Sequence, residues 1–532
     1  MNEKIDEREP VSMLFAAPPA KYRGIPFWSW NCKVTRELID TQLPIFRQMG
    51  FGGVDIHPRT GLDTEYLGEE YLELVKYTVQ RCKELGLACW LYDDDRFPSG
   101  SAAGIVTRNL KYRGRFLLLT EKRIGLPEGF YENRESFDLA VLNGEKPAGY
   151  YVTAYGLCLT RDGRLRSYRR LFGQKEIRQA YQNGERIRYA YVKLMEEEAW
   201  FEDQAYVDTM NPEAVAEFIR VTHEQYKERL GKYFGNGIEA FFTDEPSMLG
   251  TYMDGPPTTP AVKDPIDPDI PLLPTANYSS DIVEKFTSLR GYSPENYFTY
   301  LYEGTSDAAK RFRWDYYKTL GELMSANYSG QLGEWCEENN VSLTGHFLLE
   351  EDIYMHPVFN GNIMRNLSNM QMPGIDLLTA NPSTAVNWCA TTAKFASSAA
   401  HFRGKSKVMS EVSAAFDAVE TDNMYAKLGS IAVQYAMGVN QIGTFYRPHL
   451  MSEEDNRLFA DTIGRMGYML DGGIHESSVA VYYPIEGVYV DTLPPEHLNK
   501  FNENVRATSS NFSNLTRTLV GNQIGYDILD YV

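Results

Sequence analysis

Residues 237–246, GIEAFFTDEP, combine a short apolar run with two acidic residues and a proline at its end. An apolar run of this length, preceded by a helix-like stretch, is typical of a strand buried in a parallel sheet. Asp244 and Glu245 would then lie where the strand meets its loop, and Pro246 would rigidify the exit. Because side chains alternate along an extended chain, the two carboxyl groups are expected to point in roughly opposite directions.

Other segments of the chain have the same character, an apolar run that ends in polar or charged residues. Most of them are followed by a helix-like stretch, such as 35–49 or 69–85. In chain order, the predicted strands are 24–31, 51–57, 87–93, 237–244, 341–349, 373–378, 407–412 and 439–445. Strands that alternate with helices indicate βα units, and eight in succession predict an α/β fold of the (β/α)8 TIM-barrel type.

The alternation of predicted strands and helices is interrupted at two places. Residues 112–205 alternate apolar and polar positions and contain turn signals such as LNGE and TRDG, which predicts a β-rich insertion after the third strand. Residues 250–275 form a Pro-rich loop. We therefore assign residues 1–473 to a catalytic barrel, and residues 474–532 to a partial α/β segment that begins with a new β-like run.

Composition limits the classes of partner. The 532 residues carry a net charge of −19, and an acidic surface repels phosphate backbones and anionic lipids, so no nucleic-acid or membrane partner is expected. The six cysteines are scattered and form no Cys-x-x-Cys pair, and neither an apolar signal region nor a membrane-spanning run is visible. These features predict a cytoplasmic protein and leave a homo-oligomer open.

Ionisable and aromatic residues occupy the predicted strand ends, where barrel enzymes carry out their chemistry. The candidates are Trp30, Asp55, His57, Arg59, Asp94, Asp95, Glu245, His346, Glu350, Asp376, Glu411 and Arg447. The sequence contains no GxGxxG or Walker loop, no HExxH and no GxSxG. Carboxyl groups at many strand ends therefore indicate chemistry that is carried out by carboxylates.

Glycoside hydrolysis needs one protonated carboxyl group to assist the leaving group and one ionised carboxylate as base or nucleophile. Glu245 is the first candidate for the acid. Glu411 is the first candidate for its partner, because strands four and seven lie across the barrel mouth from one another. Glu350 is the second, since it would share a strand face with His346. The distance of each from Glu245 will decide between them.

The remaining candidates are expected to bind the substrate, an oligosaccharide or glycoside. The predicted ligands of sugar hydroxyls are Trp30, Asp55, His57, Arg59, Asp94, Asp95, His346, Asp376 and Arg447. Arginine could also recognise a carboxylated sugar through two parallel hydrogen bonds. Core packing for the tryptophan and simple ion pairs for the charged residues are the alternatives. No metal or cofactor is required by the sequence, although the acidic residues 93–95 could bind calcium.

Several motifs resemble a known family. PFWSWN, GFGGVDIHPRTGLDTEYLGEEY, LACWLYDDDRFPSGSAAG, FFTDEPS, GHFLLEED, PGID and SEVSA are similar to motifs of large bacterial glycoside hydrolases related to the α-L-rhamnosidases of glycoside hydrolase family 106. The similarity runs over residues 20–485. It implies a TIM-barrel hydrolase of plant or host glycans, an inverting mechanism with two glutamates, and Ca²⁺ in the active site.

The resemblance also bears on particular residues. Glu245 matches a catalytic glutamate by motif, whereas either Glu350 or Glu411 could match the second. Residues 477–532 are similar to the start of an amidotransferase-like domain, and the sequence is expected to stop before the C-terminal β-sandwich regions of these enzymes. A retaining β-galactosidase-like hydrolase, a non-catalytic carbohydrate-binding or scaffold barrel, and a metal-dependent lyase or isomerase remain alternatives.

Overall fold

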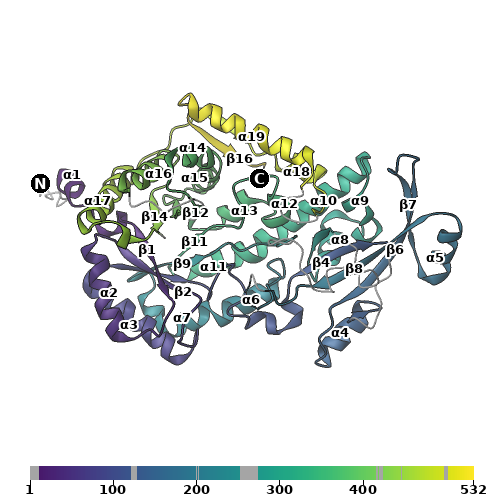
Figure 1. The fold of residues 1–532 in the computed structure, drawn as a ribbon, viewed down its shortest axis with the longest axis horizontal. Helices are drawn as coiled ribbons and strands as arrows, with labels where there is room; N and C mark the ends of the chain where they lie inside the picture. Colours follow the sequence, from purple (N-terminus) through teal and green to yellow (C-terminus); the bar gives the residue numbers. More distant parts are fainter. Residues whose placement is uncertain are drawn as a thin grey trace, which may run out of the picture.

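A closed barrel of eight parallel strands forms the centre of the protein, and helices surround it (Figure 1). The computed structural model describes residues 11–121, 129–198, 201, 203–251, 274–414, 417, 423–444, 446–495 and 501–531. The barrel strands are β1 (Ile25–Trp30), β2 (Gly53–Pro58), β3 (Ala88–Tyr92), β9 (Ile238–Thr243), β11 (Ser342–Gly345), β12 (Met372–Leu377), β13 (Met409–Val412) and β14 (Gln441–Thr444). They neighbour one another in chain order and β14 closes on β1, so the predicted (β/α)8 barrel is confirmed.

The helices around the barrel begin and end at capping residues. The Thr35 hydroxyl accepts a hydrogen bond from the backbone N–H of Leu38 at the start of α2, and α3 ends at Gly86 in the left-handed conformation. The barrel helices are α2 (Arg36–Gln48), α3 (Glu69–Leu85), α6 (Pro212–Val221), α7 (His223–Leu230), α8 (Ile282–Arg290), α9 (Thr299–Tyr302), α10 (Asp307–Met324), α11 (Gln331–Glu338), α12 (His356–Phe359), α13 (Ile363–Ser368), α14 (Pro382–Cys389), α15 (Thr392–Phe402), α16 (Met424–Ala436) and α17 (Glu453–Leu470). A short helix, α1 (Val11–Ala16), precedes the first strand.

The fifth barrel strand is shorter than the sequence predicts. A strand over 341–349 was expected, but β11 ends at Gly345. The φ of Gly345 is 129°, and a Cβ atom there would lie 1.9 Å from the carbonyl oxygen of Thr243, so only glycine fits. The chain leaves the sheet at this point, and His346 and Glu350 therefore do not share a strand face.

Apolar side chains fill the barrel below its carboxyl-terminal mouth. Trp90, Tyr92, Phe242 and Met409 belong to this inner cluster. Polar side chains of alternate strand residues extend it toward the mouth. Asp55 lies in register with Phe27 and Trp90 of the neighbouring strands, which places it on the inner face as well.

The insertion forms a separate sheet beside the barrel (Figure 1). Its strands are β4 (Arg115–Thr120), β5 (Phe130–Tyr131), β6 (Gly149–Leu159), β7 (Leu165–Leu171), β8 (Arg186–Leu194) and β10 (Thr275–Tyr278). It also contains the helices α4 (Arg134–Leu142) and α5 (Gly173–Gln182). Strand β10 comes from the end of the Pro-rich loop and pairs antiparallel with β4, which the sequence analysis did not predict. Residues 252–273 of that loop lie outside the described residues.

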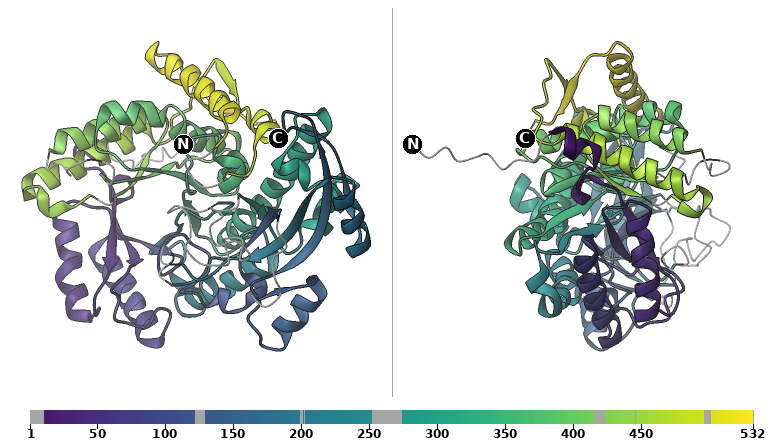
Figure 2. Two further views of the ribbon diagram at one scale, coloured as in Figure 1. Left: turned by 45° about the vertical axis from the view of Figure 1, so that its right-hand side comes forward. Right: turned by 90° about the vertical axis from the view of Figure 1, so that its left-hand side faces the viewer.

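The C-terminal segment packs on one side of the barrel (Figure 2). Its strands β15 (Val479–Tyr482) and β16 (Tyr526–Leu529) pair in parallel, and α18 (Ile485–Asp491) and α19 (Glu503–Gly521) lie between them in sequence. Asp527 joins β16 to α15, because its Oδ1 lies 3.2 Å from Lys394 Nζ and 3.0 Å from His401 Nδ1. His475 Nε2 is 3.5 Å from the same oxygen. This carboxylate is one of several groups that join the segment to the barrel, and Asp530, which accepts a hydrogen bond of 2.7 Å from Asn362, is another.

Replacing Asp527 with asparagine is expected to destabilise the protein by about 2 kcal/mol, because nearly buried Lys394 loses its counter-charge. Burial opposes ionisation of Asp527, but His401, Lys394 and His475 together lower its pKa. The stabilisation is therefore present above the unfolded-state pKa of about 3.9 and is lost as the pH falls below it. Thermal unfolding of both proteins from pH 7 to pH 3 checks this: the gap between them should narrow at acid pH, and a constant gap would contradict it.

Among the described residues, no helix is both long and apolar enough to cross a membrane.

Candidate active site

The segment that follows β9 places two carboxyl groups at the barrel mouth. Tyr92 donates a hydrogen bond of 2.7 Å to Asp244 Oδ2, and His346 Nε2 lies 3.1 Å from Asp244 Oδ1. Glu245 has a φ of 48°, in the left-handed region, and its side chain is half-buried. Its carboxylate oxygen, a His346 ring nitrogen and an Asp376 oxygen lie within 4.8 Å of one another.

This arrangement differs from the expected one. Asp244 and Glu245 do not point in opposite directions, and both approach the ring of His346. The physical reason is that the chain is no longer extended at Glu245, so the alternation of a strand does not apply there. A non-glycine residue in the left-handed region is uncommon, and such residues occur often at active sites.

His346 lies at the centre of the carboxyl groups. Its side chain is almost fully buried, and its Nδ1 is 3.6 Å from Glu411 Oε2, while its Nε2 contacts Asp244. The ring therefore lies between the segment after β9, which carries Asp244 and Glu245, and β13, which carries Glu411. The structure brings together Glu245, His346, Asp376 and Glu411, all of which the sequence analysis selected.

Glu350 is held differently from Glu411. Its Oε1 accepts a hydrogen bond of 2.7 Å from the backbone N–H of Asp376, and its Oε2 accepts one of 3.4 Å from the backbone N–H of Phe347. One oxygen thus bonds to strand β12 and the other to the loop after β11. Glu411, in contrast, approaches a side chain of the site itself.

Burial and the charges of neighbouring groups shift the pKa values of these carboxyl groups, upward for the two glutamates and downward for Asp244. Burial, followed by the charges of Asp244 and Glu351, raises the pKa of Glu245 well above its usual range, and Arg59 opposes the shift. Burial and the charges of Asp244 and Glu245 likewise raise the pKa of Glu411. For Asp244, burial is outweighed by hydrogen bonds and charge from His346, so its pKa is lowered. Asp244 is therefore the residue that stays ionised, whereas Glu245 favours its protonated form.

The residues after β2 line the neighbouring part of the mouth. His57 stacks on Tyr92 with ring centroids 3.9 Å apart, and its Nε2 lies 3.3 Å from an Arg59 nitrogen. Asp55 is fully buried below them, and neither of its carboxyl oxygens has a hydrogen-bond partner in the described part of the chain. Burial, followed by the charges of Asp244 and Asp93, raises the pKa of Asp55. His57 and Arg59 thus reach the site, whereas Asp55 lies beneath it.

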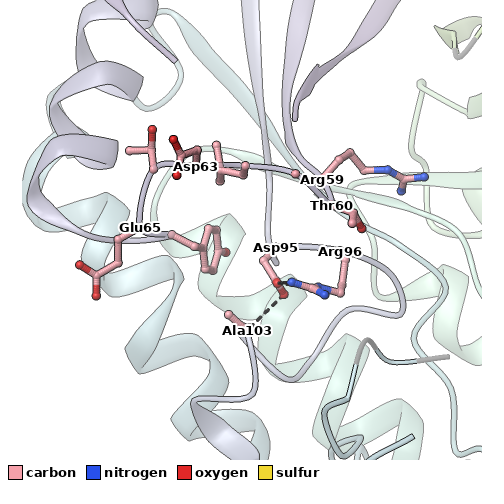
Figure 3. Close-up of a pocket in the computed structure, with 11 residues that line it drawn as sticks. Arg59, Thr60, Asp63, Glu65, Asp95, Arg96 and Ala103 are labelled. Carbon is pink, nitrogen blue, oxygen red and sulfur yellow. Dashed lines mark hydrogen bonds and ion pairs between the residues drawn. The ribbon is translucent and has the colours of Figure 1, made fainter. Parts of the chain in front are cut away.

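A cleft of about 400 Å³ opens beside these residues, between the loops after β2 and β3 (Figure 3). Arg59 and Asp95 both line it, and Asp95 forms an ion pair with Arg96. Arg59 both lines the cleft and contacts His57, so it connects the cleft with the residues after β2. Asp94 is not part of its lining: its oxygens accept hydrogen bonds from the backbone N–H groups of residues 95, 100, 101, 102 and 103, which hold the β3 loop in shape.

One predicted substrate ligand lies outside the site. Trp30 is on the outer face of β1, where its ring packs edge-on against Trp28 and Tyr71 of α3. It is a core residue, because side chains alternate along β1 and its neighbours in sequence face the barrel interior. Arg447 follows β14 and is exposed.

Tyr92 is a residue of the site that was not among the predicted candidates. It donates a hydrogen bond to Asp244 and stacks on His57. Its position two residues after Trp90, on the same strand face and next to the acidic run, is the signal that could have identified it.

The donor groups at the mouth suit a hard cation. Two sets of side chains bring ligand atoms within 4.8 Å of one another: Asp244, His346 and Glu411, and Glu245, His346 and Asp376. Asp376 Oδ1 is also buried without a hydrogen-bond partner in the described residues. Calcium prefers oxygen ligands, so these carboxylates fit it, whereas the histidine does not favour it.

Comparison with known proteins finds a similar family and a similar barrel structure. Residues 273–443 match the family described as alpha-L-rhamnosidase, glycoside hydrolase family 106. A rhamnosidase from Novosphingobium sp. PP1Y has a similar structure, with a TM-score of 0.60 and 15% identity over 98% of this chain and 64% of its own. The chain is related to the family 106 rhamnosidases. The relation to this family that the motifs indicate is thereby confirmed, and the matched residues include the motifs GHFLLEED, PGID and SEVSA.

Two further proteins are similar to this chain. A β-galactosidase from Rahnella sp. R3 has a TM-score of 0.52 and 9% identity, over 97% of this chain and 66% of its own. A curated protein from Formosa agariphila, named as a β-glucuronidase, is 33% identical over 73 residues, which are 13% of this chain and 6% of that protein. The chain spans less than two thirds of the length of each protein to which it is similar here.

Proposed function

We propose that the chain is a glycoside hydrolase in which Glu245 is the general acid and Glu411 the general base. The observation that carries the proposal is that both glutamates lie close to His346 at the barrel mouth. The raised pKa of Glu245 suits an acid that must hold its proton, whereas Glu411, whose pKa is raised as well, must lose its proton before it can act as the base. Glu411 is preferred to Glu350 because both oxygens of Glu350 are occupied by backbone N–H groups.

In the proposed reaction, Glu245 donates its proton to the glycosidic oxygen as the bond from that oxygen to the anomeric carbon breaks. Glu411 accepts a proton from the water that attacks the anomeric carbon from the opposite face. The base ends protonated and the acid ionised, so before the next turnover Glu411 releases a proton to solvent and Glu245 takes one up. The charge of the ionised Asp244 raises the pKa values of both glutamates, and the His346 ring contacts Asp244 and Glu411.

The relation to the rhamnosidases supports an α-L-rhamnoside as substrate and inversion at the anomeric carbon. The cleft between Arg59 and Asp95 would hold the sugar next to the scissile bond. A retaining β-galactosidase-like reaction is the second candidate, and it would use the same two glutamates at a shorter separation. A bound calcium ion, held by Asp376 and a neighbouring carboxylate, would supply ligand sites for sugar hydroxyl groups.

Hydrolysis of a panel of aryl glycosides, with α-L-rhamnosides, β-D-galactosides and β-D-glucuronides included, tests the proposal. Cleavage of an α-L-rhamnoside is expected. The first sugar anomer released, followed by proton NMR, should have the opposite configuration to the substrate. Retained configuration would favour the galactosidase-like alternative, and binding of glycans without cleavage would support the scaffold alternative.

Replacement of Arg59 with methionine is expected to move the pH–activity profile to higher pH. The charge of Arg59 lowers the pKa values of both Glu245 and Glu411, so its removal raises both. Activity as a function of pH on the best aryl glycoside measures the shift. Lys33→Met serves as the control, because Lys33 is exposed and pairs with Glu70 outside the site. A profile that keeps its position while KM rises would assign Arg59 to binding alone.

A further inference from the structure

A second cleft lies on the insertion, away from the barrel mouth. Its volume is about 400 Å³, and β6, β10, α4 and α8 contribute to its lining. Six of its residues matter here: Arg134, Tyr150, Tyr151, Tyr278, Glu284 and Glu295. The proposed hydrolysis uses none of them.

The strand that carries two of the tyrosines is irregular at this point. Tyr150, Tyr151 and Val152 are consecutive, yet all three line the same cleft. In a regular strand, neighbours point to opposite faces. The pairing of β6 with β8 shifts register between Tyr151 and Thr153, and such a bulge re-aims side chains. The Tyr151 ring is also held in place by an edge contact of 5.5 Å with Tyr191.

Polar groups gather at the floor of this cleft. Tyr150 is only 3% exposed, and its hydroxyl lies beside that of Tyr278. Burial, followed by the neighbouring Tyr150, raises the pKa of Tyr278, so the two phenols lie close together. Arg134 is half-buried at the same place. Burial lowers its pKa, and both phenols raise it. Of two neighbouring phenols, one O–H group can donate to the other, which leaves the second O–H group to donate to a ligand oxygen.

The charges of the lining indicate the kind of ligand. The lining contains the negative charges of Glu284 and Glu295 and the positive charge of Arg134. Because Arg134 already pairs with Asp138 at 3.5 Å, an anionic ligand is disfavoured. Tyrosine rings offer flat apolar faces with hydroxyl groups at their edges, which match the C–H face and hydroxyls of a sugar. We infer that this cleft is a second carbohydrate site, which binds a neutral sugar residue of a glycan without cleaving it.

The test uses the full chain with Glu245→Gln, so that binding is measured without turnover. Methyl α-L-rhamnoside, methyl β-D-galactoside and methyl β-D-glucuronide are the soluble probes, titrated by calorimetry. A galactoside that carries a photoactivatable diazirine locates the site by peptide mapping. We expect neutral probes to bind and to label peptides that contain residues 133–152 or 278–295.

Further substitutions decide whether the tyrosines hold the sugar. Tyr150→Phe keeps the ring that packs on Phe137 and removes only the hydroxyl, and we expect it to weaken this binding about fivefold. Tyr151→Ala should abolish the labelling. Tyr181→Ala, at a tyrosine of α5 that is 77% exposed, should change neither. Thermal unfolding confirms that each variant is folded.

Three results would overturn the inference: labelling confined to the barrel mouth, labelling that survives both cleft substitutions, and binding of the glucuronide alone. None depends on hydrolysis, so failure of the second site is distinguishable from failure of the proposed function.

Discussion

Glu245→Gln is expected to lower kcat about 1,000-fold on a glycoside with a poor leaving group, because the leaving oxygen must then depart without a proton. The loss should be much smaller for an aryl glycoside such as a dinitrophenyl glycoside, whose leaving group needs little protonation. Measurement of kcat over a series of leaving groups gives a steeper dependence on leaving-group pKa for the variant than for the parent protein.

Glu239→Gln is the matched control, since Glu239 lies on the same strand, β9, near its amino end. It should leave the kinetics unchanged. If Glu245→Gln instead loses the same factor with every leaving group, Glu245 does not donate the proton, and the role of acid would pass to another carboxyl group of the mouth.

The periodicity of the sequence was enough to find the barrel and the strand ends. Segment 237–244 predicts β9 almost residue for residue, because a buried strand of a parallel sheet must be apolar and is bounded by polar residues. Since the carboxyl ends of barrel strands converge, the strand-end residues Glu245, Asp376 and Glu411 could be selected without coordinates.

Local backbone turns could not be predicted in the same way. The left-handed turn at Glu245 brings its carboxyl group to His346, and the close approach of Gly345 to Thr243 ends β11 early. Both depend on contacts between strands that are distant in sequence. The early end of β11 also separates Glu350 from His346, so the argument from a shared strand face failed for this pair.

The sequence also did not predict on which face of its strand an aromatic side chain lies. Trp30 and Tyr92 both lie in apolar strands, and composition alone does not say which of them faces the barrel interior. Strand register decides it: Tyr92 joins the inner cluster, and Trp30 packs against the helices.

Glu411→Gln is expected to lower kcat about 1,000-fold with good and poor leaving groups alike. The reason is that the attacking water loses its base, and no property of the leaving group can replace that. Kinetics over the same leaving-group series therefore separate the two glutamates: a steeper dependence for Glu245→Gln and a uniform loss for Glu411→Gln.

Glu350→Gln distinguishes the second candidate for the base. The Glu350 carboxylate accepts backbone hydrogen bonds from Asp376 and Phe347, and loss of its charge should weaken them by about 2 kcal/mol in total. We expect a lower melting temperature with kcat reduced less than about tenfold. A folded Glu350→Gln protein that loses activity with every leaving group, beside an active Glu411→Gln protein, would exchange the two assignments. The hydrogen bonds favour Glu411, because a carboxylate that bonds to strand β12 and to the loop after β11 cannot also turn toward a water molecule.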